Sequence, residues 1–156
     1  MKKIYIETSI ISYYTSRPSR DLVIAARQEI TREAWPVLVS QFDLYISALV
    51  IQEVRRGNKE AAQKRLDVIS DFPIIKISDR SRDLAKVFVA KGIIPEKSEE
   101  DALHISLACM GGMDFLLTWN FKHLNNAITK SSIVRAIEEH GFQAPEICSP
   151  EELIGD

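Results

Sequence analysis

Short apolar runs rich in β-forming residues alternate along the chain with longer amphipathic stretches. Apolar runs of this length, bounded by polar or turn residues, predict buried strands. We expect strands at Lys3–Ile6, Phe42–Ser47, Ile74–Ile77, within 113–120 and at Glu146–Cys148. The segment 113–120 ends in polar side chains, which makes its carboxyl end a place to look for chemistry.

The stretches between these runs carry apolar residues at helical spacing, with charged residues on the opposite face. A long helix is expected from about 20 to 40, and Pro36 inside it predicts a kink or a split. Ser98 followed by acids predicts the start of a helix over 98–108. Further helices are expected at 10–14 (a short one), around 49–54, and at 59–70, 79–91 and 131–140, with a last turn after Ser149-Pro150.

This alternation of strands and helices indicates the fold class. Short apolar strands separated by helices favour right-handed crossovers and a parallel sheet that helices cover on both faces. The sequence therefore predicts an α/β fold. In such sheets, ligands bind beyond the carboxyl ends of the strands, where the strand order reverses.

Composition narrows the organisation of the chain. Its 156 residues, of which 46% are hydrophobic, suit one compact domain, and no repeat or linker divides 1–156. The net charge of −2 excludes a global basic footprint for nucleic acid, so any basic binding surface must be local.

The two cysteines, Cys109 and Cys148, are too few for a disulfide framework. We expect free buried thiols, with a single pairing between them left open. No signal peptide and no apolar run of about 20 residues is visible. The sequence thus predicts a soluble, cytoplasmic protein without a membrane partner.

Oxygen-bearing side chains follow two of the predicted strands. Glu7, Thr8 and Ser9 come directly after the first strand, and Thr118 and Asn120 end the fourth. Such side chains suit a hard cation. A dinucleotide site is excluded at this position, because no glycine-rich turn follows the first strand.

Two further acids, Glu53 and Asp101, lie in predicted helices among largely apolar neighbours. Carboxylates brought close together in a low dielectric repel one another unless a cation neutralises them. Glu7, Glu53 and Asp101 would place three carboxylates together, and Asn120 would add a neutral carbonyl. This set suits Mg²⁺ and metal-assisted phosphodiester hydrolysis.

Taken singly, each of these residues also fits an ordinary structural role. Asp101 fits a capping box with Ser98. Glu7 fits a surface acid, Thr8 and Ser9 fit N-caps, Glu53 fits a solvated helix end and Asn120 fits a turn residue. The joint pattern favours a site, because four coincidences would have to fall at places that the topology brings together.

Three ring-bearing residues lie beside these candidates. His104 follows Asp101 by three residues and shares its helix face, so it is either a metal ligand or, as we expect, a packed histidine that donates to the backbone or a nearby acid. Trp119 and Phe121 flank Asn120. They would stack RNA bases or, in the safer interpretation, belong wholly or partly to the core.

Together, these segments resemble the PIN domain and, within it, the VapC-like toxin ribonucleases. The resemblance covers roughly residues 1–150 and depends on the order and spacing of the motifs more than on any one of them. The segments that carry it are Tyr5-Ile6-Glu7-Thr8-Ser9, Gln52-Glu53, Glu100-Asp101-Ala102-Leu103-His104-Ile105 and Leu117-Thr118-Trp119-Asn120-Phe121.

The resemblance implies a three-layer α/β/α fold with strand order 3-2-1-4-5. It also implies Mg²⁺- or Mn²⁺-dependent endonucleolytic cleavage of single-stranded RNA, leaving a 5′-phosphate and a 3′-hydroxyl. A small antitoxin protein and a second copy of the chain are the implied partners. The implied metal and catalytic residues are Glu7, Glu53, Asp101 and Asn120, with Thr8, Ser9 and Thr118 orienting them.

Two positions depart from the family pattern. Glu7 stands where the family usually has Asp, and Asn120 where it often has Asp. The loss of one negative charge weakens a second metal more than the first. An alternative is therefore a PIN-like module that binds RNA or protein without cutting. A third interpretation, a flavodoxin-like response domain, lacks a Lys clearly placed beyond the last strand.

Overall fold

The computed structural model describes residues 1–154, which are organised around a five-stranded parallel sheet in the order β3-β2-β1-β4-β5. This order is the one that the resemblance implied. The strands are β1 (Lys3–Ile6), β2 (Asp43–Ser47), β3 (Ile74–Ile75), β4 (Phe115–Leu117) and β5 (Glu146–Cys148).

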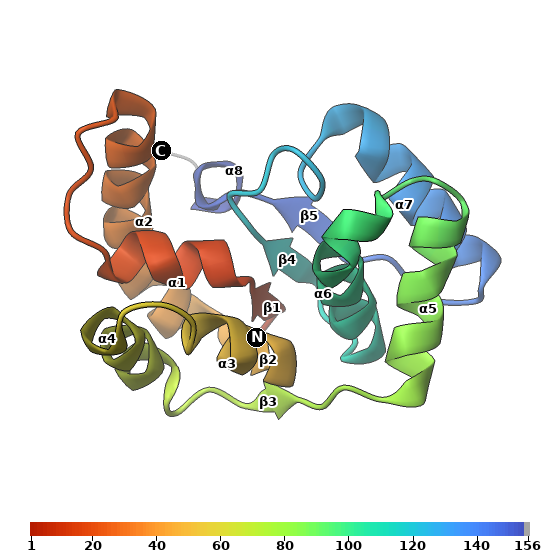
Figure 1. Cartoon of the computed structure of the whole chain (residues 1–156), viewed down its shortest axis with the longest axis horizontal. Coiled ribbons are helices and arrows are strands. Elements are labelled where there is room, and N and C mark those ends of the chain that lie inside the picture. Colours follow the sequence, from red (N-terminus) through yellow and green to blue (C-terminus); the bar gives the residue numbers. More distant parts are fainter. Residues whose placement is uncertain (155–156) are drawn as a thin grey trace.

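Helices flank the sheet on both sides, so the fold has three layers (Figure 1). Helices α1, α2 and α4 gather on one side, and α5, α6 and α7 on the other. The helices are α1 (Thr8–Thr15), α2 (Leu22–Gln41), α3 (Ala48–Val54), α4 (Lys59–Ile69), α5 (Asp79–Ala90), η1 (the 3-10 helix Glu96–Ser98), α6 (Glu99–Met110), α7 (Ala127–Glu139) and α8 (Pro150–Ile154).

The central strand β1 is buried on both faces. Ile4, Tyr5 and Ile6 are fully buried, as expected for the middle strand of a covered parallel sheet. The strand pairs in parallel with β2 on one side and β4 on the other, and Ile6 lies opposite Leu117. This register brings the residues that follow β1 and β4 together at one edge of the sheet.

Two elements differ from the sequence expectation. Strand β3 ends at Ile75 instead of Ile77, because it is an edge strand that pairs only with β2 and leaves Ile74 half exposed. Helix α2 runs on through Pro36 without splitting. The buried Trp35 and Leu38 on either side hold that turn against the core, which offsets the hydrogen bond that proline cannot donate.

The start of α6 also differs. Ser98 precedes the helix, but its side chain makes no capping hydrogen bond. It closes the 3-10 helix η1 instead, with φ −112° and ψ 30°, which is not the extended conformation of a side-chain N-cap. The capping box between Ser98 and Asp101 is therefore wrong, and Asp101 is left for another role.

Helix α7 begins earlier than expected, at Ala127, because Asn126 accepts hydrogen bonds from the N–H groups of Ile128 and Thr129. Cys109 and Cys148 are free and buried, as expected. Among residues 1–154, no helix has both the length and the apolar character that crossing a membrane requires.

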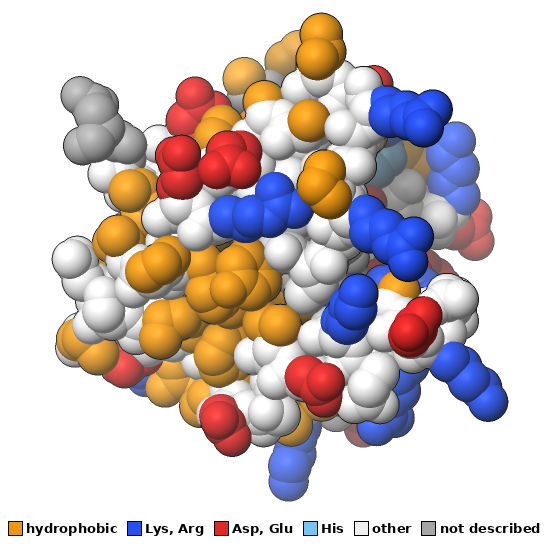
Figure 2. All heavy atoms as spheres, turned by 90° about the vertical axis from the view of Figure 1, so that its left-hand side faces the viewer, with side chains coloured by type: hydrophobic (Ala, Val, Ile, Leu, Met, Phe, Trp, Pro, Cys, Tyr) orange, Lys and Arg blue, Asp and Glu red, His pale blue; other side chains and the backbone are white. Residues whose placement is uncertain are grey.

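One face of the molecule is markedly apolar. Hydrophobic side chains gather over the side on which α1, α2 and α4 lie, with lysine and arginine side chains beside them (Figure 2). Three large apolar residues of α2 are exposed, namely Leu22 at 86%, Val23 at 58% and Val39 at 52%. Leu22 and Val23 lie at the start of α2 and Val39 near its end, so these three side chains do not form one patch by themselves. Contiguous apolar surface such as Figure 2 shows on this side is typical of a surface that binds a partner.

Candidate active site

Glu7 is anchored at the point where β1 and β4 end side by side. Its N–H donates to the carbonyl of Leu117 at 3.1 Å, which extends the β1–β4 pairing by one step. Its buried carboxylate accepts, on Oε1, hydrogen bonds from Thr118 Oγ1 at 2.7 Å and Ser9 Oγ at 2.5 Å. Glu7 is thus an oriented buried acid, and its interpretation as a surface acid is wrong.

The hydroxyls of Thr8 and Ser9 serve the acids and do not cap α1. The N-cap position of α1 belongs to Glu7, without a side-chain capping bond. Ser9 Oγ donates to Glu7 and accepts the N–H of Trp119 at 2.9 Å, and Thr8 Oγ1 donates to Glu53 Oε1. The first turn of α1 therefore links two carboxylates that lie far apart in the sequence.

Glu53 lies in the last turn of the short helix α3, with a side chain that is 15% exposed. Its Oε1 also lies 2.7 Å from Nε2 of His104. Burial alone would raise the pKa of Glu53. Together, the hydrogen bonds from His104 and Thr8 and the charges of His104 and Arg56 lower it by more than burial raises it, so the net pKa is lowered. The interpretation of Glu53 as a solvated helix end is wrong.

His104 is fully buried and hydrogen-bonded at both ring nitrogens. Nδ1 lies 2.7 Å from the hydroxyl of Tyr5, which lies 2.7 Å from Ser47 Oγ, while Nε2 contacts Glu53. Burial lowers the pKa of His104, but the bond to Glu53 and the nearby carboxylates raise it more. The expectation of a packed histidine that donates to a nearby acid is confirmed.

Tyr5 is a member of the site that the sequence pattern did not single out. It is a fully buried tyrosine in the central strand, and burial raises its pKa well above the usual value. A buried tyrosine hydroxyl needs a hydrogen-bond partner, and that requirement was the signal in the sequence. Here the hydroxyl connects β1 to the end of β2, through Ser47, and to α6, through His104.

Asp101 lies in the first turn of α6 and is coupled to the same cluster through charge. Burial raises its pKa, and the charge of Glu7 raises it further, while His104, His123 and the Asn120 side chain act in the opposite direction. The net pKa of Asp101 is raised. Burial and the charge of Glu7 therefore both disfavour the ionised form of Asp101.

Asn120 organises the loop that follows β4. Its Oδ1 accepts the N–H groups of Lys122 at 3.2 Å and His123 at 3.0 Å, and its own N–H donates to Thr118 Oγ1 at 2.9 Å. This is the arrangement of a turn residue. The two N–H groups occupy the amide oxygen that would bind a metal. A direct bond from Asn120 to the metal therefore stays a prediction.

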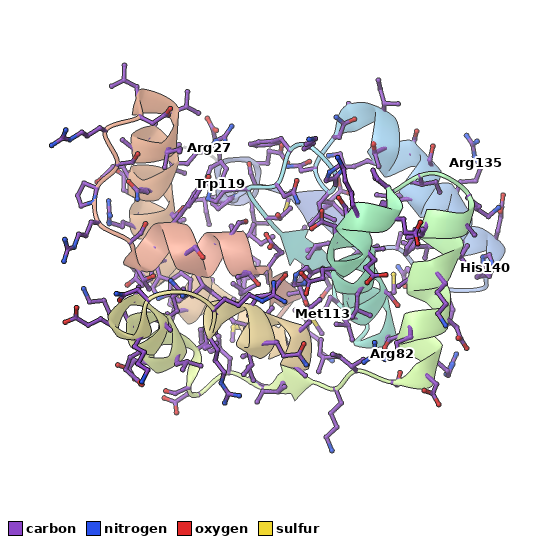
Figure 3. The ribbon with its side chains drawn as sticks, viewed as in Figure 1. Arg27, Arg82, Met113, Trp119, Arg135 and His140 are labelled. Carbon is purple, nitrogen blue, oxygen red and sulfur yellow. The ribbon has the colours of Figure 1, made fainter. Side chains whose placement is uncertain are left out.

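The loop after β4 is also held against α2. Trp119 is buried, as the core interpretation expected, and its Nε1 donates to Thr31 Oγ1 at 2.8 Å. The Arg27 guanidinium lies 5.6 Å from the centroid of the Trp119 ring (Figure 3). It also lies 4.8 Å from the centroid of the partly buried Phe121 ring. These contacts tie the loop that carries Thr118 and Asn120 to α2.

The donor set fits a divalent cation. Among the described residues, Glu7, Glu53 and His104 offer ligand atoms that all lie within 4.8 Å of one another, and Asp101 is outside this closest group. Ligands bonded at about 2.1 Å to one ion lie roughly 3–4 Å apart. Unneutralised buried carboxylates so close together are costly, which also favours a cation.

Two solved structures illustrate the similarity of this fold to VapC and VapBC proteins. A chain of the VapBC2 structure from Rickettsia felis, bound to a DNA fragment from their promoter, matches with a TM-score of 0.58 at 19% identity, over 94% of this chain and 98% of that one. VapC20 from Mycobacterium tuberculosis, described as a sarcin-ricin loop cleaving toxin, matches with a TM-score of 0.60 at 16% identity, over 77% of this chain and 92% of that one.

A comparison with curated protein sequences finds no significant match. The family model described as "PIN domain" matches residues 4–125, which include every residue of the cluster built above and most of the sheet. The chain therefore belongs to the PIN-domain family.

Proposed function

We propose that this protein is a metal-dependent endoribonuclease that hydrolyses phosphodiester bonds of single-stranded RNA, and that it is the toxin of a type II toxin–antitoxin pair. PIN domains are typically metal-dependent nucleases. The observation that carries the proposal is the convergence of Glu7, Glu53 and His104 at the carboxyl ends of β1 and β4, with Asp101 electrostatically coupled to Glu7 and His104.

In this proposal, Glu7, Glu53 and Asp101 hold Mg²⁺ or Mn²⁺, with Asn120 close by. A bound ion would lower the pKa of a water molecule and offset charge on the phosphate. Thr118 and Ser9 keep the Glu7 carboxylate in one orientation, and Thr8 does the same for Glu53. Because these hydroxyls are held by the ends of β1 and β4, the carboxylates need little rearrangement to bind an ion.

The proposed partners are an antitoxin protein and a second copy of the chain. The likeness to the VapBC2 complex supports an antitoxin. The apolar side seen in Figure 2, on which Leu22 and Val23 at the start of α2 and Val39 near its end are exposed, offers it a surface to cover. Co-expression with the protein encoded by a short neighbouring reading frame, followed by purification as a stable complex, tests this part of the proposal.

A non-cutting PIN-like module that binds RNA or protein is the second candidate. The engagement of Asn120 Oδ1 by two backbone N–H groups favours it, because that position then adds neither charge nor a free oxygen to the site. Such a module would bind RNA with the same affinity whether or not a divalent ion is present.

The deciding experiment incubates purified, partner-free protein with single-stranded RNA in Mg²⁺, in Mn²⁺ and in EDTA. We expect metal-dependent cleavage that falls at least about 100-fold in Glu7→Gln and Asp101→Asn, while circular dichroism shows both variants folded. The matched control is Glu139→Gln, on α7 in an exposed ion pair with Lys91, which should cleave like the parent. Cleavage that survives both site substitutions would refute the assignment.

A further inference from the structure

We propose that His104 is itself a ligand of the catalytic ion, through Nε2, so that the site is a mixed carboxylate–imidazole centre that prefers Mn²⁺ over Mg²⁺. This inference deepens the proposed function, because it concerns the same site and names the ion that the site selects.

Geometry places the imidazole at the centre of the cluster. Nε2 lies 2.7 Å from Glu53 Oε1 and 4.0 Å from Glu7 Oε2. These separations bracket the roughly 3–4 Å expected between neighbouring ligands of one ion. An ion between the three atoms would therefore replace the direct contact between His104 and Glu53 after a small movement of flexible carboxylate side chains.

The surroundings of His104 are those of a metal-binding histidine. Such a histidine uses one ring nitrogen for the ion, while a hydrogen bond at the other nitrogen fixes the ring. Here Nδ1 lies 2.7 Å from the Tyr5 hydroxyl, and that hydroxyl lies 2.7 Å from Ser47 Oγ. All three residues are fully buried, so the ring has one fixed orientation and presents Nε2 to the two acids.

Protons balance in a simple way. With an ion bound, Nδ1–H donates to Tyr5, Tyr5 donates to Ser47, and the lone pair of Nε2 bonds to the ion. If the ion-free ring carries protons on both nitrogens, the Nε2 proton leaves to solvent; if it carries a single proton, on Nε2, that proton is released and Nδ1 takes up another, with no net release. The two carboxylates are the exposed side of the cluster, since the Glu53 side chain is partly exposed and the His104 side chain is not, so the ion enters past the acids.

The sequence spacing agrees with this role. Asp101 and His104 are three residues apart on α6, which puts both on one helix face. Acid–x–x–histidine pairs at this spacing hold metals in helical di-iron proteins. Imidazole nitrogen is a good ligand for transition metals, whereas Mg²⁺ prefers oxygen ligands and retains its waters. One buried imidazole among the ligands therefore favours Mn²⁺ over Mg²⁺.

The test uses the full chain, freed of bound metal and loaded with Mn²⁺ alone. Pulsed electron paramagnetic resonance then reports the ¹⁴N coupling of a directly bonded imidazole. The chain has three histidines, so the double variant His123→Gln/His140→Gln keeps His104 alone. We expect the coupling in the parent and in this double variant, and its loss in His104→Gln.

Calorimetric titration provides the second measurement. We expect the parent to bind Mn²⁺ at least about 10-fold more tightly than Mg²⁺, and His104→Gln to lose about 10- to 100-fold in Mn²⁺ affinity with little change for Mg²⁺. Mn²⁺ bound without ¹⁴N coupling in the parent, or with coupling that persists in His104→Gln, would overturn the inference. A parent protein that binds no Mn²⁺ would also overturn the inference, whether or not the variants fold.

RNA cleavage is scored separately in the same preparations. If the ¹⁴N coupling is present but no RNA is cut, the ligand assignment stands and the proposed function fails. If RNA is cut and no coupling is seen, the nuclease proposal stands, and His104 serves only to position Glu53.

Discussion

The hydroxyl of Tyr5 on β1 lies 2.7 Å from Nδ1 of His104 on α6, although the two residues are 99 positions apart in the sequence. The same hydroxyl lies 2.7 Å from Ser47 Oγ, at the end of β2. One phenol group thus connects the central strand, a neighbouring strand and the helix that carries His104 and Asp101. Its removal should affect both stability and the site.

Tyr5→Phe tests this connection. The substitution keeps the ring in the core and removes only the oxygen, which leaves His104 Nδ1 without its partner. An unsatisfied buried polar atom costs about 1–3 kcal/mol, so we expect the free energy of unfolding to fall by that amount in urea denaturation. Tyr45→Phe, on a partly buried tyrosine of β2, should change it by less than about 0.5 kcal/mol. Equal effects in the two variants would contradict the prediction.

Thr118→Val addresses the orientation of Glu7. The valine retains the shape of the side chain but cannot donate to Glu7 Oε1 or accept the N–H of Asn120. Loss of a residue that orients a metal ligand typically lowers activity or metal affinity by 10- to 100-fold, and we expect about 10-fold here, because Ser9 still donates to Glu7. The measurements are Mn²⁺ affinity and the rate of RNA cleavage.

The control for Thr118→Val is Thr15→Val at the end of α1, which removes a hydroxyl that donates only to the Ile11 carbonyl. It should leave both metal affinity and cleavage rate within about twofold of the parent. If Thr118→Val matched this control, Glu7 would not depend on the hydroxyl for its orientation.

Sequence patterning was sufficient for a parallel sheet whose strands bring their carboxyl ends to one edge, and the strand order implied by the resemblance then made Glu7 and Thr118 neighbours. It was insufficient for α6. Helical spacing says that Asp101 and His104 share a face, but the rotation of the helix about its axis, which depends on packing against the sheet, decides which of them comes closest to the other acids. The hydroxyl of Tyr5 holds the ring of His104 in the closest group.

Helix caps were harder to predict from the sequence than the sheet. Ser98 has the composition of an N-cap, yet the preceding turn of 3-10 helix changes its backbone conformation and removes the bond. Thr8 and Ser9 also have the composition of N-caps. Yet the Thr8 hydroxyl binds Glu53 from a distant segment, and the Ser9 hydroxyl binds the neighbouring Glu7 and accepts the N–H of the distant Trp119. Local propensity cannot anticipate such competition from tertiary contacts.

Metal binding should stabilise the fold. An ion that binds only the folded protein adds about 2.7 kcal/mol at 100 times its dissociation constant. Thermal unfolding with Mn²⁺ should therefore occur at a higher temperature than in EDTA. Glu53→Gln should abolish most of this shift, because it removes a charged ligand and leaves the neutral amide beside His104.

Lys91→Gln, which breaks an exposed ion pair with Glu139 outside the cluster, should keep the full shift. A shift of the same size in Glu53→Gln would show that the ion binds elsewhere on the protein.

The buried thiols predict a loss of stability in alkali. Burial raises the pKa of Cys109 and of Cys148 from 9.0 to about 12. Above pH 9 the unfolded chain releases thiol protons that the folded chain retains, so stability present below pH 9 is lost progressively as the pH rises toward 12. We expect each thiol to lower the free energy of unfolding by about 1 kcal/mol per pH unit just above pH 9, which is below the ideal slope of about 1.4 because the unfolded thiol is only half ionised at pH 9. Urea denaturation of the parent and of Cys109→Ala/Cys148→Ala between pH 8 and about 10.5 measures the difference, which should narrow as the pH rises. Parallel pH profiles in the two proteins would contradict the raised thiol pKa values.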